Sequence, residues 1–161
     1  MNFEQKDRIN GCIAVEHAVA SIYGSFMRMF PEERHFWEEL HNDEVEHSVF
    51  LIETLNLFDG AMLPPDMHPP SLPFVVKTLE FANNINFRIR QRQVSLEEAL
   101  RIALELEETM VEIFINNLIS GMMSENKISS SADFGKVLAA EQEHVSRIRD
   151  MMLKKGVIRP S

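Results

Sequence analysis

Hydrophobic residues recur along the chain with the three- and four-residue spacing of amphipathic helices. This spacing predicts one long helix from about Asn2 to Met29, with apolar positions at Ile9, Cys12, Ile13, Val19, Tyr23, Phe26, Met27 and Phe30. Pro31 suits the first turn of a second helix, which the pattern continues to a break near Asp59 and Gly60. We therefore expect two antiparallel helices with a very short connection.

A proline-rich segment separates this helical pair from the rest of the chain. AMLPPDMHPPSLP contains five prolines in thirteen residues, which excludes a continuous helix and predicts an extended crossing. A shorter, additional helix is predicted from Phe74 to Asn84. Ser95-Leu96-Glu97-Glu98 then forms a Ser-x-x-Glu capping box, which predicts the start of a third long helix that ends near Gly121.

The polar run SENKISSSAD predicts a loop before the fourth long helix. Ser130, Ser131 or Asp133 can cap the start of that helix, and Gly156 lies where a helix commonly stops. The pattern as a whole predicts an all-α single domain over residues 1–161. Its architecture is a four-helix bundle of two antiparallel hairpins joined by the long Pro-rich crossover.

Composition narrows the class of protein. The formal net charge of −9 argues against nucleic acid as a partner, because such binders need clustered Lys and Arg. Cys12 is the only cysteine, which excludes an internal disulfide and a four-cysteine metal centre within the chain. No run is apolar enough for a membrane span, and the first ten residues lack a signal-peptide pattern. The expected location is the cytoplasm.

Two glutamates interrupt apolar stripes. On the first helix Glu16 lies between Ile13 and Tyr23, and on the third Glu107 lies between Ala103 and Met110. A charged group on the inward face of a helix needs a compensating cation or a metal ion. These two carboxylates are therefore candidate metal ligands.

The second and fourth helices each carry a Glu-x-x-His pair on an apolar face, Glu44 with His47 and Glu141 with His144. Residues three apart share a helical face, so such a pair can bind one metal ion or two adjacent ones. One instance alone means little, because charged residues at this spacing usually form a solvated face. Two matched instances favour the metal site over coincidental buried ion pairs.

The spacing of these residues indicates that the two hairpins are related by a pseudo-twofold axis. Glu16 and Glu107 are 91 residues apart, and Glu44 and Glu141 are 97 apart, as are the two histidines. Glu16 also precedes Met29 by the same thirteen residues by which Glu44 follows Pro31, which places both glutamates at one height in an antiparallel hairpin. The six side chains should therefore meet in the bundle core.

Four carboxylates and two imidazoles match the core site of carboxylate-bridged di-metal proteins. Two divalent cations would balance the four charges, and oxygen donors mixed with imidazole suit Fe, with Mn and Zn as alternatives. Asp43 could rival Glu44 as a ligand, but its counterpart in the second half is Ala140, so symmetry selects Glu44. Tyr23 is a candidate hydrogen-bond donor beside the metals, although an aromatic residue on an apolar stripe is more often simply core.

These motifs resemble the rubrerythrin branch of the ferritin-like superfamily. The matching stretches are AVEHAVASIY with Glu16, DEVEH with Glu44 and His47, ALELEETMVEIF with Glu107, and AEQEH with Glu141 and His144. The resemblance covers essentially the whole chain and implies a ferritin-like fold. It also implies that Glu44 and Glu141 bridge two iron ions, that Glu16 and Glu107 are terminal ligands, and that each histidine binds one metal.

The resemblance implies a di-iron oxidoreductase that reduces peroxide or dioxygen, or oxidises Fe(II), in oxidative stress or iron detoxification. The four cysteines of a rubredoxin-type domain are absent, so a separate reductase or electron donor would supply electrons. A homo-oligomer, with a dimer favoured, is also implied. The alternatives are an iron-storage assembly and a metal-stabilised bundle without turnover.

Overall fold

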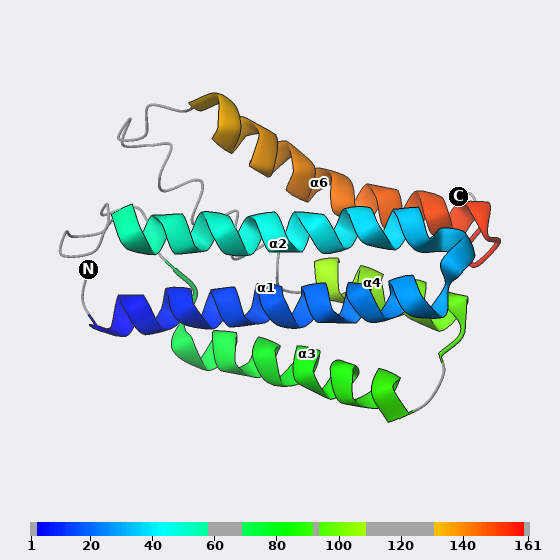
Figure 1. The fold of residues 1–161 in the computed structure, drawn as a ribbon, viewed down its shortest axis with the longest axis horizontal. Helices are drawn as coiled ribbons and strands as arrows, with labels where there is room; N and C mark the ends of the chain where they lie inside the picture. The colour runs from blue at the N-terminus through cyan, green and yellow to red at the C-terminus, as the bar shows by residue number, and fades with distance from the viewer. Residues whose placement is uncertain (1–2, 58–68, 92–93, 109–130, 160–161) are drawn as a thin grey trace.

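A computed structural model shows that the chain is helical and contains no β-strand within the residues that it describes. These are residues 3–57, 69–91, 94–108 and 131–159, and the side chains of 131–142 are not described. The elements are α1 (Phe3–Met29), a 3₁₀ turn (Pro31–Glu33), α2 (Arg34–Leu57), α3 (Leu72–Gln91), α4 (Leu96–Leu106) and α6 (Ser131–Lys154). Figure 1 shows α1 lying between α2 and α3, with α4 behind α1 and the C-terminal half of α6 beside α2.

The first two helices form the antiparallel pair that the sequence predicts. α1 ends at Met29, Pro31 begins the 3₁₀ turn, and α2 follows directly. Trp37 packs against Phe26, with ring centroids 4.9 Å apart, and both side chains are fully buried. Burial of such aromatic surfaces is worth several kcal/mol and holds the short connection in place. The predicted break near Asp59 and Gly60 lies outside the described residues.

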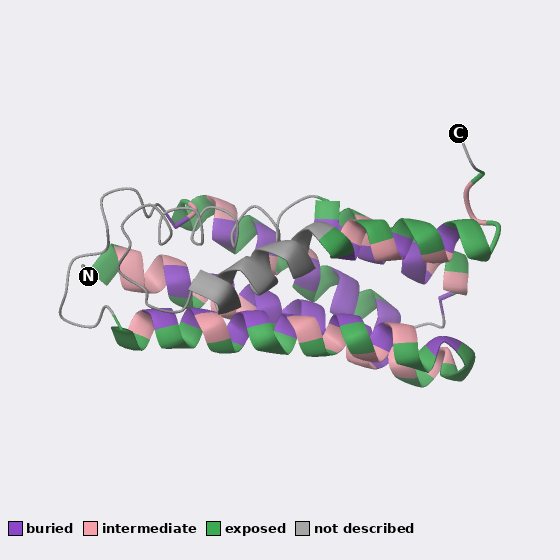
Figure 2. Cartoon of the chain, turned by 90° about the horizontal axis from the view of Figure 1, so that it is seen from above, coloured by how far each residue is buried: buried purple, intermediate pink, exposed green. Residues whose placement is uncertain are grey.

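The prediction of a short helix at 74–84 was wrong in length. α3 extends from Leu72 to Gln91, because Ile85 and Ile89 continue the buried stripe begun by Val75 and Ala82. Figure 2 shows such buried stripes on the helix sides that face other helices. The side-chain amide of Asn86 also donates to the carbonyl oxygen of Ala18 at 2.8 Å, which ties α3 to α1. α3 is therefore a long helix that packs against α1.

The start of α4 and the end of α6 follow the predicted capping chemistry. Ser95 is the N-cap of α4, and its hydroxyl oxygen accepts a 3.1 Å hydrogen bond from the backbone N–H of Glu98. After α6, Gly156 has φ +71°, and the N–H of Val157 donates to the carbonyl of Met152 at 2.8 Å. This is the Schellman arrangement that closes a helix at glycine. The predicted extension of the third helix to Gly121 lies outside the described residues, as does most of the Pro-rich crossover.

The side chain of Lys155, after α6, pairs with the carboxylate of Glu33 in the turn before α2 and anchors the C-terminal end of α6 there. None of the described helices combines the length and the apolar character needed to cross a lipid bilayer.

Candidate metal centre

Four helical segments each contribute a polar side chain to one buried cluster. Glu16 comes from α1, Glu44 and His47 from α2, Glu107 from the end of α4, and His144 from α6. The three glutamates and His144 have no exposed surface, and His47 is 2% exposed. The backbone is π-helical at Glu107 and Glu108, a local distortion that often accompanies functional sites.

The cluster consists of two groups of potential ligands that share one carboxylate. Glu16, Glu44 and His47 each offer one donor atom, and these atoms lie within 4.8 Å of one another. Glu44, Glu107 and His144 form a second group by the same measure. Because Glu44 belongs to both groups, its carboxylate lies where it could link two adjacent cations. The helices thus bring together five of the six predicted ligands in a buried cluster that could hold metal ions.

The carboxylates of Glu16 and Glu44 have the character expected of metal ligands. All four of their oxygens are buried and make no hydrogen bond within the described part of the chain. The Nδ1 atom of the His47 ring lies 3.4 Å from Glu44 and 3.8 Å from Glu16. Buried carboxylate oxygens are normally hydrogen-bonded, because a bare one loses its hydration without compensation. Two divalent cations would provide that compensation, so the residues fit a di-metal group.

Glu107 differs because both of its oxygens have hydrogen-bond partners. The Tyr23 hydroxyl donates to Oε1 at 2.6 Å, and the Nδ1 of His144 lies 3.3 Å from Oε2. Burial alone would raise the pKa of Glu107, but the hydrogen bond and charge of His144 and the hydrogen bond from Tyr23 together outweigh it, and the pKa lies below its ordinary value. Burial and then the charge of Glu107 raise the pKa of Tyr23, so this hydroxyl stays protonated and remains a donor. The Tyr23 hydroxyl thus contacts the cluster as a hydrogen-bond donor.

Glu44 has the opposite electrostatic character. Burial raises its pKa well above the ordinary value, and the nearby charge of Glu107 raises it further, while His47 only partly offsets both. Without metal, this carboxyl therefore tends to hold a proton. A cation that binds between the two groups has to displace that proton, because a metal ligand must be deprotonated.

Sequence reasoning missed the role of Asp43. Its carboxylate oxygen accepts from the Nε2 of His144 at 3.0 Å and also pairs with Arg147. The Nδ1 of His144 faces the cluster, so Asp43 orients the imidazole from behind, as the outer partners of metal-bound histidines do. The hydrogen bond to His144 lowers the pKa of Asp43 against the effect of burial, and Arg147 lowers it further. The signal in the sequence was a carboxylate just before Glu44 together with an arginine three residues after His144.

The lone thiol is not part of the donor set. Cys12 is fully buried. Burial, reinforced by the charge of Glu16, raises the pKa of its thiol to about 12. A thiol of this kind stays protonated at neutral pH, so it is a poor metal ligand. The available donors are oxygens and imidazole nitrogens, which suit Fe, Mn or Zn.

The sixth predicted ligand, Glu141, lies within α6, three residues before His144, but its side chain is outside the described residues. The interpretation of the cluster therefore depends on the other five side chains and on their chemistry. Comparison of the chain with protein-family models, with curated proteins and with solved structures found no match.

Proposed function

We propose that this chain is a di-iron oxidoreductase of the rubrerythrin-like, ferritin-like kind. It would reduce peroxide or dioxygen, or oxidise Fe(II). The observation that carries the proposal is the pair of buried ligand groups joined at Glu44, with four carboxylate oxygens that make no hydrogen bond to any described residue. A bundle built only for stability would gain by replacing such groups with apolar side chains.

Two iron ions, when bound, would supply one electron each, and cleavage of one O–O bond consumes two. Glu44 would lie between the two ions, with Glu16 and His47 on one side and Glu107 and His144 on the other. Glu141 would complete the ligand set by symmetry with Glu44.

The chain's own residues would orient the ligands and exclude bulk water. Tyr23 fixes one oxygen of Glu107, which leaves the other directed at His144. Asp43 fixes the His144 ring. The buried side chains of Trp37 and Phe26 pack on the Tyr23 ring and exclude solvent from that side. Fixed ligands in a dry cavity keep a metal site at the geometry that its reaction needs.

The first test is elemental analysis of protein purified without added metal, followed by stopped-flow mixing of the Fe(II)-loaded protein with peroxide and with dioxygen. We expect two metal ions per chain and a fast rise of ferric charge-transfer absorbance with at least one oxidant. Glu44→Gln should abolish that rise. Glu46→Gln, which removes an exposed carboxylate from the same helix, should leave it unchanged.

The other outcomes identify the alternatives. Tightly held zinc and no absorbance change with either oxidant would favour a metal-stabilised bundle without turnover. A large cage on size exclusion that accumulates iron would favour storage. Either result would replace the oxidoreductase proposal.

A further inference from the structure

Three hollows lie along the surface that α1 shares with α3 and with the start of α2. One, of about 490 Å³, is lined by Arg28, Phe30 and Arg90 among others. A second, of about 460 Å³, includes Arg28 and Arg34, and a third, of about 560 Å³, includes Phe87 and Arg90. Arg28 lines the first and second hollows and Arg90 the first and third, so the three form one continuous surface, here called the arginine face.

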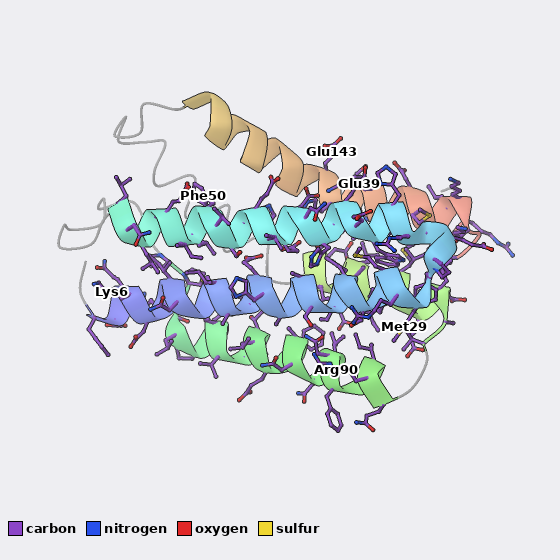
Figure 3. The ribbon with its side chains drawn as sticks, in the orientation of Figure 1. Lys6, Met29, Glu39, Phe50, Arg90 and Glu143 are labelled. Carbon is purple, nitrogen blue, oxygen red and sulfur yellow. The ribbon has the colours of Figure 1, made fainter. Side chains whose placement is uncertain are left out.

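The arginine face is cationic in an acidic protein. Among the described residues, no carboxylate lines any of the three hollows, although the chain carries a net charge of −9. Arg28, Arg34 and Arg90 are exposed, and none of them has a carboxylate partner in the described part of the chain. Figure 3 shows Arg90 on one side of the molecule, with Glu39 and Glu143 on the opposite side. This separation of charge favours the approach of an acidic partner from one direction.

The same face carries the apolar and polar groups of an interaction surface. Phe87 is 65% exposed and lines a hollow together with Arg90. Aromatic residues and arginines are the side chains most enriched in protein interfaces. The amide of Asn86 lines this hollow too; its nitrogen is engaged by Ala18, while its buried Oδ1 makes no hydrogen bond in the described residues.

A chain of aromatic rings connects the arginine face with the buried cluster. Phe30 lines the hollow at Arg28, and its ring centroid lies 6.3 Å from that of Trp37. The rings of Trp37 and Tyr23 are stacked with centroids 6.0 Å apart, and the Tyr23 hydroxyl donates to Glu107. Trp37 and Tyr23 are the only tryptophan and the only tyrosine of the chain. Electron transfer through protein is faster across closely packed groups than across gaps, so this path leads from the surface to the candidate metal centre.

We propose that the arginine face docks a small acidic one-electron carrier protein, which delivers electrons to the metal centre by way of Phe30, Trp37 and Tyr23. This inference rests on the proposed function. The single cysteine excludes a four-cysteine redox centre among these 161 residues, so the reducing electrons would come from outside them. Each encounter oxidises one carrier and reduces one ferric ion, and two encounters restore the two electrons that one O–O bond consumes. Redox encounters of this kind use small, strongly charged interfaces.

The test uses the iron-loaded full chain, oxidised, and chemically reduced flavodoxin as the acidic carrier. Stopped-flow loss of ferric absorbance gives a second-order rate constant. We expect Arg90→Glu to lower that constant by about tenfold at low salt, and the difference from wild type to shrink as salt screens the charges. Lys77→Glu is the matched control: it is exposed on the same helix, makes the same charge change, and lies about 20 Å from Arg90 along the axis.

Two further readouts separate failure of the docking proposal from failure of the proposed function. Dithionite, a small reductant, should reduce wild type and both variants at the same rate; if it reduces none of them, the proposed redox function fails. Binding is measured independently, by titrating flavodoxin into ¹⁵N-labelled, zinc-loaded protein. Salt-sensitive shifts of backbone amides around Arg28 and Arg90 would support the arginine face. Equal slowing by Arg90→Glu and Lys77→Glu, or shifts confined to other surfaces, would overturn it.

Discussion

Individual side chains in the buried cluster have distinct electrostatic roles. Glu107 is held as a carboxylate by Tyr23 and His144, whereas burial drives Glu44 toward its protonated form. Two carboxyl groups in one cavity cannot both ionise freely, so their pKa values separate. A metal ion resolves this conflict because it stabilises both groups as carboxylates.

The hydrogen bond from Tyr23 to Glu107 should contribute measurably to stability. Tyr23→Phe keeps the stacked ring but removes the donor, so a fully buried carboxylate oxygen loses its 2.6 Å partner. We expect the metal-free protein to lose about 1–3 kcal/mol of unfolding free energy, because the desolvated acceptor is left unpaired. Urea unfolding followed by circular dichroism measures the change. A difference below about 0.5 kcal/mol would show that the hydrogen bond does not stabilise the folded protein.

Asp43 should act on metal affinity through His144. Asp43→Asn preserves the shape of the side chain but weakens its hold on Nε2 of the imidazole. We expect one of the two metal ions to bind about 10- to 100-fold more weakly, while the ion beside Glu16 and His47 is little affected. Anaerobic titration with Fe(II) or Co(II) resolves the two sites.

The control for Asp43 is Glu53→Gln, which removes an exposed carboxylate from the same helix. If both variants bind the two ions alike, Asp43 has no positioning role and its contacts with His144 and Arg147 are only structural.

At the scale of elements, α1 is the helix against which both α2 and α3 pack (Figure 1). Close approach to α3 is possible because residue 11 is glycine. A Cβ built on Gly11 would overlap the Cγ1 of Val75, whereas a Cβ on Gly24 meets nothing closer than 3.7 Å, the Nδ1 of His41.

This difference predicts opposite effects of the same substitution at two positions of one helix. Gly24→Ala should stabilise the protein by about 0.5–1 kcal/mol, because alanine has the better helix propensity. Gly11→Ala should destabilise it by about 1–3 kcal/mol, because buried Val75 has to shift or α3 has to move away. Chemical denaturation of both variants provides the comparison. Equal stabilisation by the two alanines would show that α3 can move away from α1 without loss of unfolding free energy.

Much of this arrangement could be predicted from sequence, and the exceptions have physical reasons. The ends of α1, the capping of α4 by Ser95 and the stop at Gly156 follow from local chemistry that a linear sequence reveals. The length of α3 was not predicted. Ile85 and Ile89 continue the helical spacing of Val75 and Ala82, but their burial depends on packing against α1, which the segment alone does not specify. Asp43 was considered only as a metal ligand and was rejected because its counterpart in the second half is Ala140. Its contact with His144 joins α2 to α6, and no pattern within one helix predicts such a contact.

At the scale of the whole molecule, the acidic charge is divided between the core and the surface. Part of the net charge of −9 lies in the core, where the three described glutamates of the cluster have no contact with solvent. The remaining acidity lies on the surface, from which the arginine face is set apart. Binding two divalent cations would therefore neutralise the buried glutamates and leave the surface carboxylates and arginines in place.

Metal removal should consequently weaken the fold in a pH-dependent manner. In the metal-free protein the pKa of Glu44 is raised, so folding favours its protonated form and stability falls as pH rises above the unfolded value of about 4.3. The pKa values of Glu107 and Asp43 are lowered, so the stability that these two groups contribute is lost only as pH falls below their unfolded pKa values. Between about pH 5.5 and 8, Glu44 therefore decides whether these three carboxyl groups together raise or lower stability as pH rises. Metal binding strengthens with pH because its ligands must release protons.

The gap in unfolding free energy between metal-loaded and chelated protein should thus widen from about pH 5.5 to about pH 8, by up to about 1.4 kcal/mol per pH unit for each proton displaced. Urea unfolding with and without a chelator measures it. Chelated Glu44→Gln should be less sensitive to pH than chelated wild type, because glutamine has no proton to lose. A gap that is constant with pH would mean that Glu44 is already ionised before the metal arrives, and that the cluster is balanced by its histidines instead.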